Sequence, residues 1–259
     1  DVCSSDLKQL VEKGVLASDV PEHTDSFPLP DEAIQEAVRT VTDDFRGIST
    51  LMSDPERALP LVREAYEHSE GTDAVIYARI LAVFGDGRGA PDIANALRQT
   101  DWDQGWNFTG MGQFGRSMSP VDDLIVALGR TENAEHALEP ILEKARALNA
   151  GQALSHFRSV AKALKMLEDE RAAPVLADLL QKPDIKGHSF TSINDMVAKT
   201  PADPNDTTTR NLALRELFVA RALYRCGDHQ GLGAATLQEY AQDLRGHFAA
   251  HARAVLATK

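Results

Sequence analysis

The chain has 259 residues, of which 43% are hydrophobic and 25% charged, a composition typical of a folded globular protein rather than a disordered one. Its formal net charge of -12 opposes binding to a nucleic-acid backbone or an anionic lipid surface. No apolar run is long enough to span a bilayer. We therefore expect no nucleic-acid partner and no membrane partner. Cys3 and Cys226 are the only cysteines, which excludes a disulfide framework and a cysteine-based metal site.

The first seven residues resemble a sequence that is not of natural protein origin. Residues 1–7, DVCSSDL, resemble the translated end of a common short-read sequencing adaptor. This predicts that residues 1–7 are an adaptor artefact and that the natural protein continues upstream of Lys8. A natural polar N-terminus is the alternative. Residues 8–30 are proline-containing and are typical of a linker or the tail of a missing upstream domain. Because a targeting segment would lie upstream, the sequence indicates no cellular compartment.

Helical periodicity begins at Asp31. Apolar residues recur at helical spacing from Ile34 to Phe45. A second helix has a clear start, with Asp54 as the N-cap and Pro55 in the first turn. A third segment, 72–84, is apolar on several sides, which predicts a helix with neighbours on both flanks.

An internal repeat decides the predicted fold. Similar turns lie at Gly85, Gly129 and Glu168, spaced by 44 and 39 residues, and a fourth follows 59 residues later at Gly227. Each of the first three is followed, five residues on, by an alanine that lets two helices approach closely: Ala90, Ala134 and Ala173. A period near 40 residues with two helices per unit is typical of HEAT and armadillo repeats. We predict an all-α, HEAT/armadillo-like α-solenoid of about four to five helix pairs over residues 31–259.

Three details refine this prediction. The turn glycines should accommodate left-handed helix ends, so Glu168 predicts a strained or differently closed turn. The polar, proline-containing segment 183–209 is an insertion that lengthens the last repeat. Residues 248–256 form a plausible capping helix.

The segment 101–120 interrupts the repeat. It is too rich in glycine for a helix and too rich in aromatic residues for a solvated linker, so it predicts an ordered loop. Its aromatic rings and one arginine form a candidate docking platform, because tryptophan and arginine are enriched in binding hot spots: Trp102, Trp106, Phe108, Phe114 and Arg116. The alternative is that the rings cover the core between two repeat units.

Other motifs carry little chemistry. Gly110 to Gly115 match G-x-G-x-x-G, but the preceding WNFT is a weak strand at most and a helix rather than a second strand follows. His247 and His251 have the spacing of two zinc ligands on a helix, yet no third ligand suggests itself. The acid pairs Asp43-Asp44 and Asp122-Asp123 are expected on solvated faces near helix ends. The sequence predicts no catalytic, cofactor-binding or metal-binding residue.

Three stretches carry a family resemblance: 101–130, GHSFTS at 187–192 and LRELFVARALYRCGD at 214–228. Together they resemble the C-terminal helical-repeat region of large bacterial FAD-dependent oxidoreductases. The resemblance implies a non-catalytic domain that docks on or shields its own upstream flavin domain, with FAD bound there and not here. The alternatives are a free-standing scaffold that binds another protein through its concave face, and an independent enzyme acting at the aromatic loop.

Overall fold

Helices provide all the regular structure in the part of the chain that the computed structural model describes, residues 29–44, 46–105, 118–131, 133–203 and 205–258. Within those ranges there are thirteen α-helices and no β-strand, which confirms the all-α prediction. The helices are α2 (Asp31–Thr40), α3 (Gly47–Ser53), α4 (Pro55–Glu67), α5 (Gly71–Val83), α6 (Ala90–Gln99), α7 (Pro120–Arg130), α8 (Ala134–Ala147), α9 (Leu154–Leu167), α10 (Ala173–Leu180), α11 (Ile193–Lys199), α12 (Thr208–Arg225), α13 (Leu232–Tyr240) and α14 (Gly246–Leu256).

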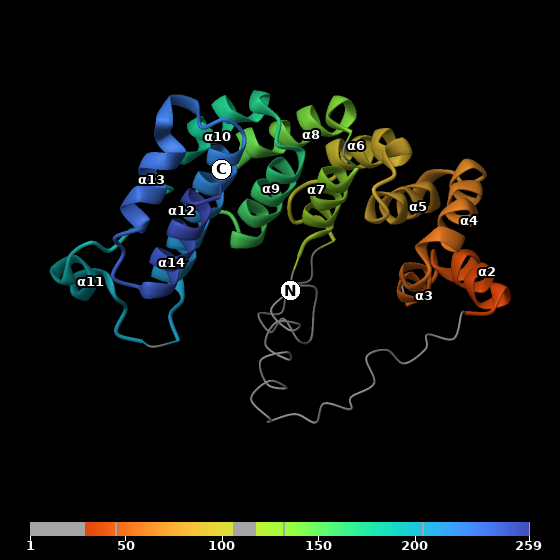
Figure 1. Cartoon of the computed structure of the whole chain (residues 1–259), viewed down its shortest axis with the longest axis horizontal. Helices are drawn as coiled ribbons and strands as arrows, with labels where there is room; N and C mark the ends of the chain where they lie inside the picture. Colours follow the sequence, from red (N-terminus) through yellow and green to blue (C-terminus); the bar gives the residue numbers. More distant parts are fainter. Residues whose placement is uncertain (1–28, 45, 106–117, 132, 204, 259) are drawn as a thin grey trace.

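The helices stack into an arch with two rows (Figure 1). The inner row is α5, α7, α9 and α12, and successive members contact one another. The outer row includes α6, α8 and α10, which also contact one another in sequence. The helices of the two rows bury their apolar stripes against each other, as a helical repeat requires. The inner row therefore presents one continuous surface to the hollow of the arch.

Helix α5 joins two hydrophobic clusters. Its Tyr77, Ile80 and Leu81 pack with α2, α3 and α4, whereas Ala78 and Ala82 pack with the rest of the stack. The Tyr77 hydroxyl also donates a hydrogen bond to the Val38 carbonyl at 2.9 Å. The predicted burial of this segment on several sides is confirmed.

The repeat turns agree with the sequence at three of four positions. Gly85, Glu168 and Gly227 all have left-handed backbones, with φ of 75°, 47° and 103°. Glu168 thus closes its turn as the glycines do, although a Cβ in that conformation costs about 1 kcal/mol. Each of Ala90, Ala134 and Ala173 is the first residue of an outer helix, as the repeat requires.

The prediction for Gly129 was wrong. Gly129 lies inside α7 rather than in a left-handed turn. A Cβ at this position would lie 2.6 Å from the Ala163 Cα and 3.0 Å from the Ala163 carbonyl oxygen. Its glycine is therefore required by the close approach of α7 to α9 and not by the turn.

The segment 183–209 packs onto the last repeat through its first half. Ile185 and Phe190 are buried, and the buried carboxylate of Glu216 on α12 accepts hydrogen bonds from the backbone amides of Gly187 and His188 at 2.9 and 2.8 Å. The second half carries α11, whose Ile193 and Val197 are exposed.

Candidate functional site

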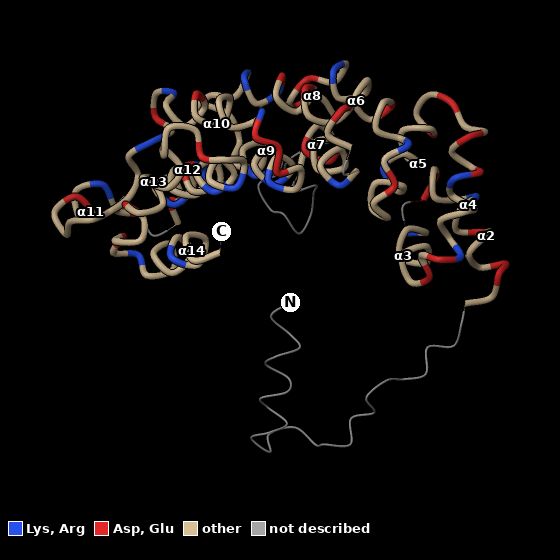
Figure 2. Tube along the Cα trace, turned by 45° about the horizontal axis from the view of Figure 1, so that its top comes forward, with Lys and Arg blue, Asp and Glu red and all other residues tan. Residues whose placement is uncertain are grey.

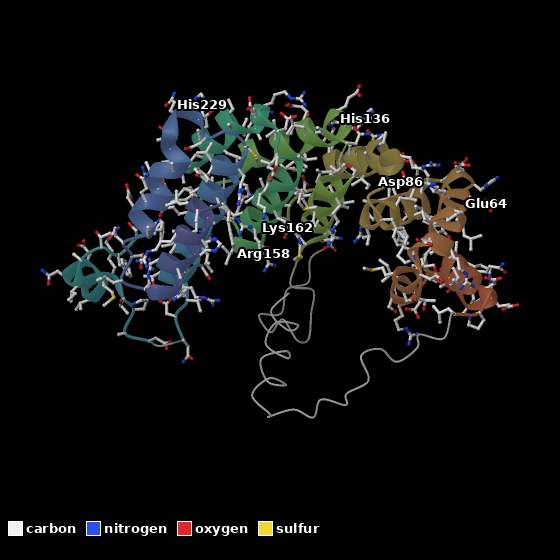
Figure 3. The ribbon with its side chains drawn as sticks, viewed as in Figure 1. Glu64, Asp86, His136, Arg158, Lys162 and His229 are labelled. Carbon is white, nitrogen blue, oxygen red and sulfur yellow. The ribbon has the colours of Figure 1, made fainter. Side chains whose placement is uncertain are left out.

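Basic side chains gather on the inner row. Figure 2 shows Lys and Arg along the hollow side of α7, α9 and α12, while acidic residues are more frequent on the outer side of the arch. On α9 the spacing explains the pattern, because Arg158, Lys162 and Lys165 lie at i, i+4 and i+7 and so share one helix face. Figure 3 shows Arg158 and Lys162 on that side, and His136 and His229 on the opposite edge. A chain of net charge -12 therefore has a cationic inner face.

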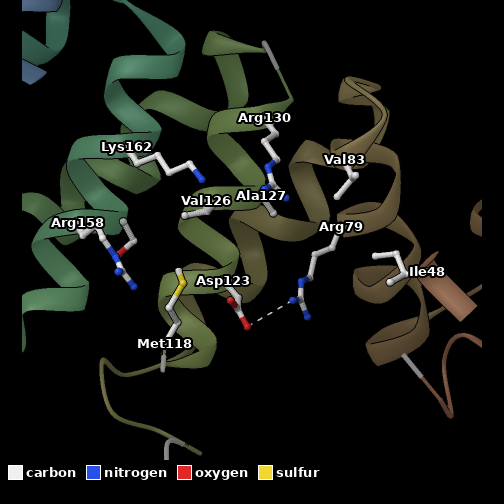
Figure 4. A pocket seen from close by; sticks show the side chains of 11 residues that line it. Ile48, Arg79, Val83, Met118, Asp123, Val126, Ala127, Arg130, Arg158 and Lys162 are labelled. Carbon is white, nitrogen blue, oxygen red and sulfur yellow. Dashed lines mark ion pairs between the residues drawn. The ribbon is translucent and has the colours of Figure 1, made fainter. Parts of the chain in front are cut away.

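A pocket of about 400 Å³ opens on this face between α5, α7 and α9. One part of its lining is apolar and includes Val83, Val126 and Met118. The other part is charged and consists of Arg79, Asp123, Arg130, Arg158 and Lys162. The side chain of Lys162 extends from α9 toward α7, where Arg130 lies beside Ala127 (Figure 4). The pocket can therefore contact an apolar group and an anionic group of the same ligand.

Among the described residues, one carboxylate lies in the pocket lining, and it faces an arginine. Asp123 Oδ2 lies 3.5 Å from Arg79 Nη2. Arg130, Arg158 and Lys162 form no ion pair with any carboxylate of the described residues. Burial lowers the pKa of Lys162, and the neighbouring charges of Arg130 and Arg158 lower it further. These like charges repel one another, so an anion bound among them would be stabilised.

A second group of cations continues the surface toward the C-terminus. Burial, followed by the charges of Arg221 and Arg225 on α12, lowers the pKa of Lys165. Burial also lowers the pKa of His251 on α14, with contributions from Arg221 and Lys165. Cations thus form a path from the pocket along α9 and α12 to α14.

Beneath this surface lies a buried polar cluster at the start of α7. Asp122 is fully buried; its Oδ1 lies 3.0 Å from His156 Nδ1 and also accepts a hydrogen bond from the Ser159 hydroxyl. Its Oδ2 accepts the Ser119 amide in a capping box. Burial alone would raise the pKa of Asp122, but the hydrogen bonds from His156 and Ser159 hold it below its ordinary value.

This cluster has the residue types of a hydrolytic triad but not the arrangement. The Ser159 hydroxyl contacts Asp122 and backbone carbonyls and not the His156 imidazole, so the histidine is not placed to activate the serine as in a triad. His156 is only 1% exposed. The cluster fastens α9 to α7 and supports the cationic surface above it. Asp122 corrects the expectation that this acid lies on a solvated face.

Of the five proposed docking residues, the structure describes only Trp102. Its ring is half-buried and stacks on His156, with the ring centroids 4.5 Å apart. Lys144 lies over the same ring, 5.9 Å from its centroid. The other four proposed docking residues, and the G-x-G-x-x-G motif, lie outside the described residues: Trp106, Phe108, Phe114 and Arg116.

The remaining sequence candidates are placed as follows. His251 faces Arg221 and Lys165, whose charges would repel a divalent metal ion, and His247 packs against Phe248. Among the residues with described positions, no cluster of three or more His, Cys, Asp or Glu side chains has metal-binding geometry. Cys226 is buried as expected, and burial raises the pKa of its thiol to about 12. Every helix in the described ranges is too short or too polar to span a bilayer.

The comparisons with known proteins match one repeat. Residues 158–182 match the family model of the PBS lyase HEAT-like repeat. That segment covers most of α9 and all of α10, an inner helix with its outer partner. Neither the curated proteins nor the solved structures gave a significant match to the chain. The match supports a helical repeat of the HEAT-like kind and gives no support to an oxidoreductase parent.

Proposed function

We propose that this chain is a protein-binding scaffold whose cationic inner face holds an acidic segment of a partner protein. The observation that carries this proposal is the set of inner-face cations without carboxylate partners among the described residues, on a chain that is acidic overall. HEAT-like repeats support a binding role because their stacked helices form an extended concave surface. The four inner helices supply such a surface here.

An acidic protein segment fits better than a nucleic acid. A duplex or long single strand would extend beyond the narrow cationic path and approach the acidic outer side, where repulsion opposes association. A short peptide lies within the path. Its side chains also match the apolar part of the pocket, which a phosphodiester backbone would leave unused.

The family resemblance suggests a specific partner. If the chain is part of an FAD-dependent oxidoreductase, the acidic segment belongs to an upstream flavin domain that binds FAD, and the loop containing Trp106 contributes to docking. This finer proposal rests on the resemblance alone. Sequencing the source DNA upstream of Lys8 tests it: a frame encoding a strand, a G-x-G-x-x-G turn and a helix supports it. Natural coding sequence for DVCSSDL, with no such domain, overturns it.

The scaffold proposal is tested with a fluorescently labelled hexaglutamate peptide and the full chain. Binding is followed by fluorescence anisotropy for the wild type and for the double variant Arg158→Gln/Lys162→Gln. We expect the double variant to raise Kd by about tenfold, which corresponds to about 1.4 kcal/mol shared by two exposed charge contacts. Raising the ionic strength should weaken binding of the wild type.

The matched control is Arg98→Gln/Arg146→Gln. It removes the same charge from exposed positions on the outer helices α6 and α8. This variant should bind hexaglutamate like the wild type. Equal weakening by both double variants would show that only net charge matters and would contradict the proposed inner-face site. Absence of hexaglutamate binding by the wild type would contradict the proposed scaffold function.

A further inference from the structure

We infer that the pocket between α5, α7 and α9 binds a phosphorylated side chain of the acidic partner. This inference rests on the proposed function and deepens it, because it assigns one kind of residue to one place on the inner face. The proposed phosphoryl site consists of the pocket residues alone. The second cation group, around Lys165 and Arg221, then holds the neighbouring acidic part of the peptide.

The charge in the pocket favours a dianion over a single carboxylate. Its lining holds four cations and one carboxylate, and that carboxylate, Asp123, is next to Arg79. The excess is contributed by Arg130, Arg158 and Lys162. One carboxylate neutralises one of these charges and leaves two that repel each other. A phosphoryl group carries about -1.5 to -2 at neutral pH and offers three acceptor oxygens, so it can pair with more than one of these donors.

The donors come from two helices held rigidly together. Arg130 lies in the last turn of α7, and Arg158 and Lys162 lie one turn apart on α9. Their backbones are fixed by the contact of Gly129 with Ala163 and by the buried link from Asp122 to His156. The helix backbones that carry the cations are therefore positioned before a ligand arrives, which reduces part of the ordering cost of binding.

The apolar side of the pocket indicates a side chain rather than free phosphate. Ile48, Val83 and Val126 line the same space as the cations, and the volume of about 400 Å³ exceeds what a phosphoryl group alone fills. An apolar residue next to the phosphorylated one would occupy the remainder. Inorganic phosphate would leave this apolar surface hydrated and should bind weakly.

The test compares three labelled peptides of one design, Glu-Glu-Leu-X-Leu-Glu-Glu, in which X is phosphoserine, glutamate or serine. Affinities are measured with the full chain by fluorescence anisotropy. We expect the phosphoserine peptide to bind about tenfold more tightly than the glutamate peptide and more tightly still than the serine peptide. Millimolar inorganic phosphate should compete only weakly, and a single-stranded oligonucleotide of equal charge should bind more weakly than the phosphopeptide.

The possible failures are distinguishable. Equal binding of the phosphoserine and glutamate peptides would overturn the phosphoryl site and leave the acidic-peptide scaffold standing. No binding of any peptide would overturn both proposals. Tighter binding of the oligonucleotide, or strong competition by inorganic phosphate, would show that the pocket prefers a phosphate source other than a phosphorylated side chain. Either result would overturn the inference.

Two variants on one helix face locate the effect. Lys162→Gln removes a cation that lines the pocket, whereas Lys165→Gln removes one on the same face of α9 that does not line it. The readout is the ratio of the two affinities, phosphoserine over glutamate. Lys162→Gln should reduce this ratio severalfold, and Lys165→Gln should weaken both peptides without changing it. A ratio that responds equally to both variants would place the phosphoryl group outside the pocket. Far-UV circular dichroism confirms that both variants are folded.

Discussion

His156 Nδ1 on α9 lies 3.0 Å from Asp122 Oδ1 in the first turn of α7, and both residues are buried, so this contact joins two helices of the inner row. The same carboxylate completes the capping box with Ser119. The Asp122 side chain thus helps to cap the N-terminus of α7 and also attaches the neighbouring helix α9. The cationic surface of α9 depends on this attachment.

Asp122→Ala should lower the free energy of unfolding by about 3 kcal/mol, because it removes the cap and the buried carboxylate that contacts His156 Nδ1 and the Ser159 hydroxyl. Urea unfolding followed by circular dichroism measures the change. Asp123→Ala is the matched control. Asp123 and its partner Arg79 are both partly exposed, so this substitution should cost less than about 1 kcal/mol. Equal losses would contradict the structural role of Asp122.

The low pKa of Asp122 predicts an acid-sensitive contribution to stability. Because the folded-state pKa lies below the ordinary value of 3.8, the unfolded chain binds a proton more readily. The contribution is therefore fully present above about pH 4 and is lost as the pH falls through the folded-state pKa. The stability difference between the wild type and Asp122→Asn should be constant from about pH 7 to 5 and should narrow below about pH 4. A difference that changes near neutral pH would contradict this assignment.

Gly129→Ala should destabilise the protein by about 2 kcal/mol, because the added methyl group meets the backbone of Ala163 on a neighbouring helix. Thermal or urea unfolding detects the loss. Gly246→Ala is the control: it begins α14, and a Cβ there has no atom of another element within 4 Å. We expect that substitution to be neutral or slightly stabilising, so a similar loss at both positions would contradict the close-approach explanation.

Glu168→Gly should raise the free energy of unfolding by about 1 kcal/mol, because glycine adopts the left-handed backbone at φ 47° without the Cβ clash. Glu168→Ala removes the same carboxylate but keeps a Cβ, so it should give no such gain. A stabilisation shared by both variants would indicate that charge, and not backbone strain, limits this turn.

The sequence predicted the helical stack because its evidence is local and repeated. Apolar stripes, caps such as Asp54, and alanines at the starts of outer helices each follow from a few neighbouring residues. The backbone conformations at Gly129 and Glu168 were harder to predict. A glycine serves a left-handed turn or a close helix contact equally well, and a single sequence does not show which of the two applies.

The candidate site was not predictable in the same way. Arg158, Lys162 and Lys165 stand at helical spacing in the sequence, yet such a stripe is ordinarily a solvated face. Only the stacking of α5, α7, α9 and α12 brings them together with Arg79 and Arg130. The sequence favoured the aromatic loop instead, and of its proposed docking residues the structure describes Trp102 alone, against His156.

The most direct measurement is a cross-linking map of the bound acidic peptide. A hexaglutamate peptide carrying a central benzophenone amino acid is irradiated with the full chain, and the cross-linked residues are identified by mass spectrometry. The inner-face account predicts cross-links on α5, α7, α9 and α12, with few on α6, α8 and α10. Cross-links that concentrate on the outer helices, or that spread evenly over both rows, would contradict it.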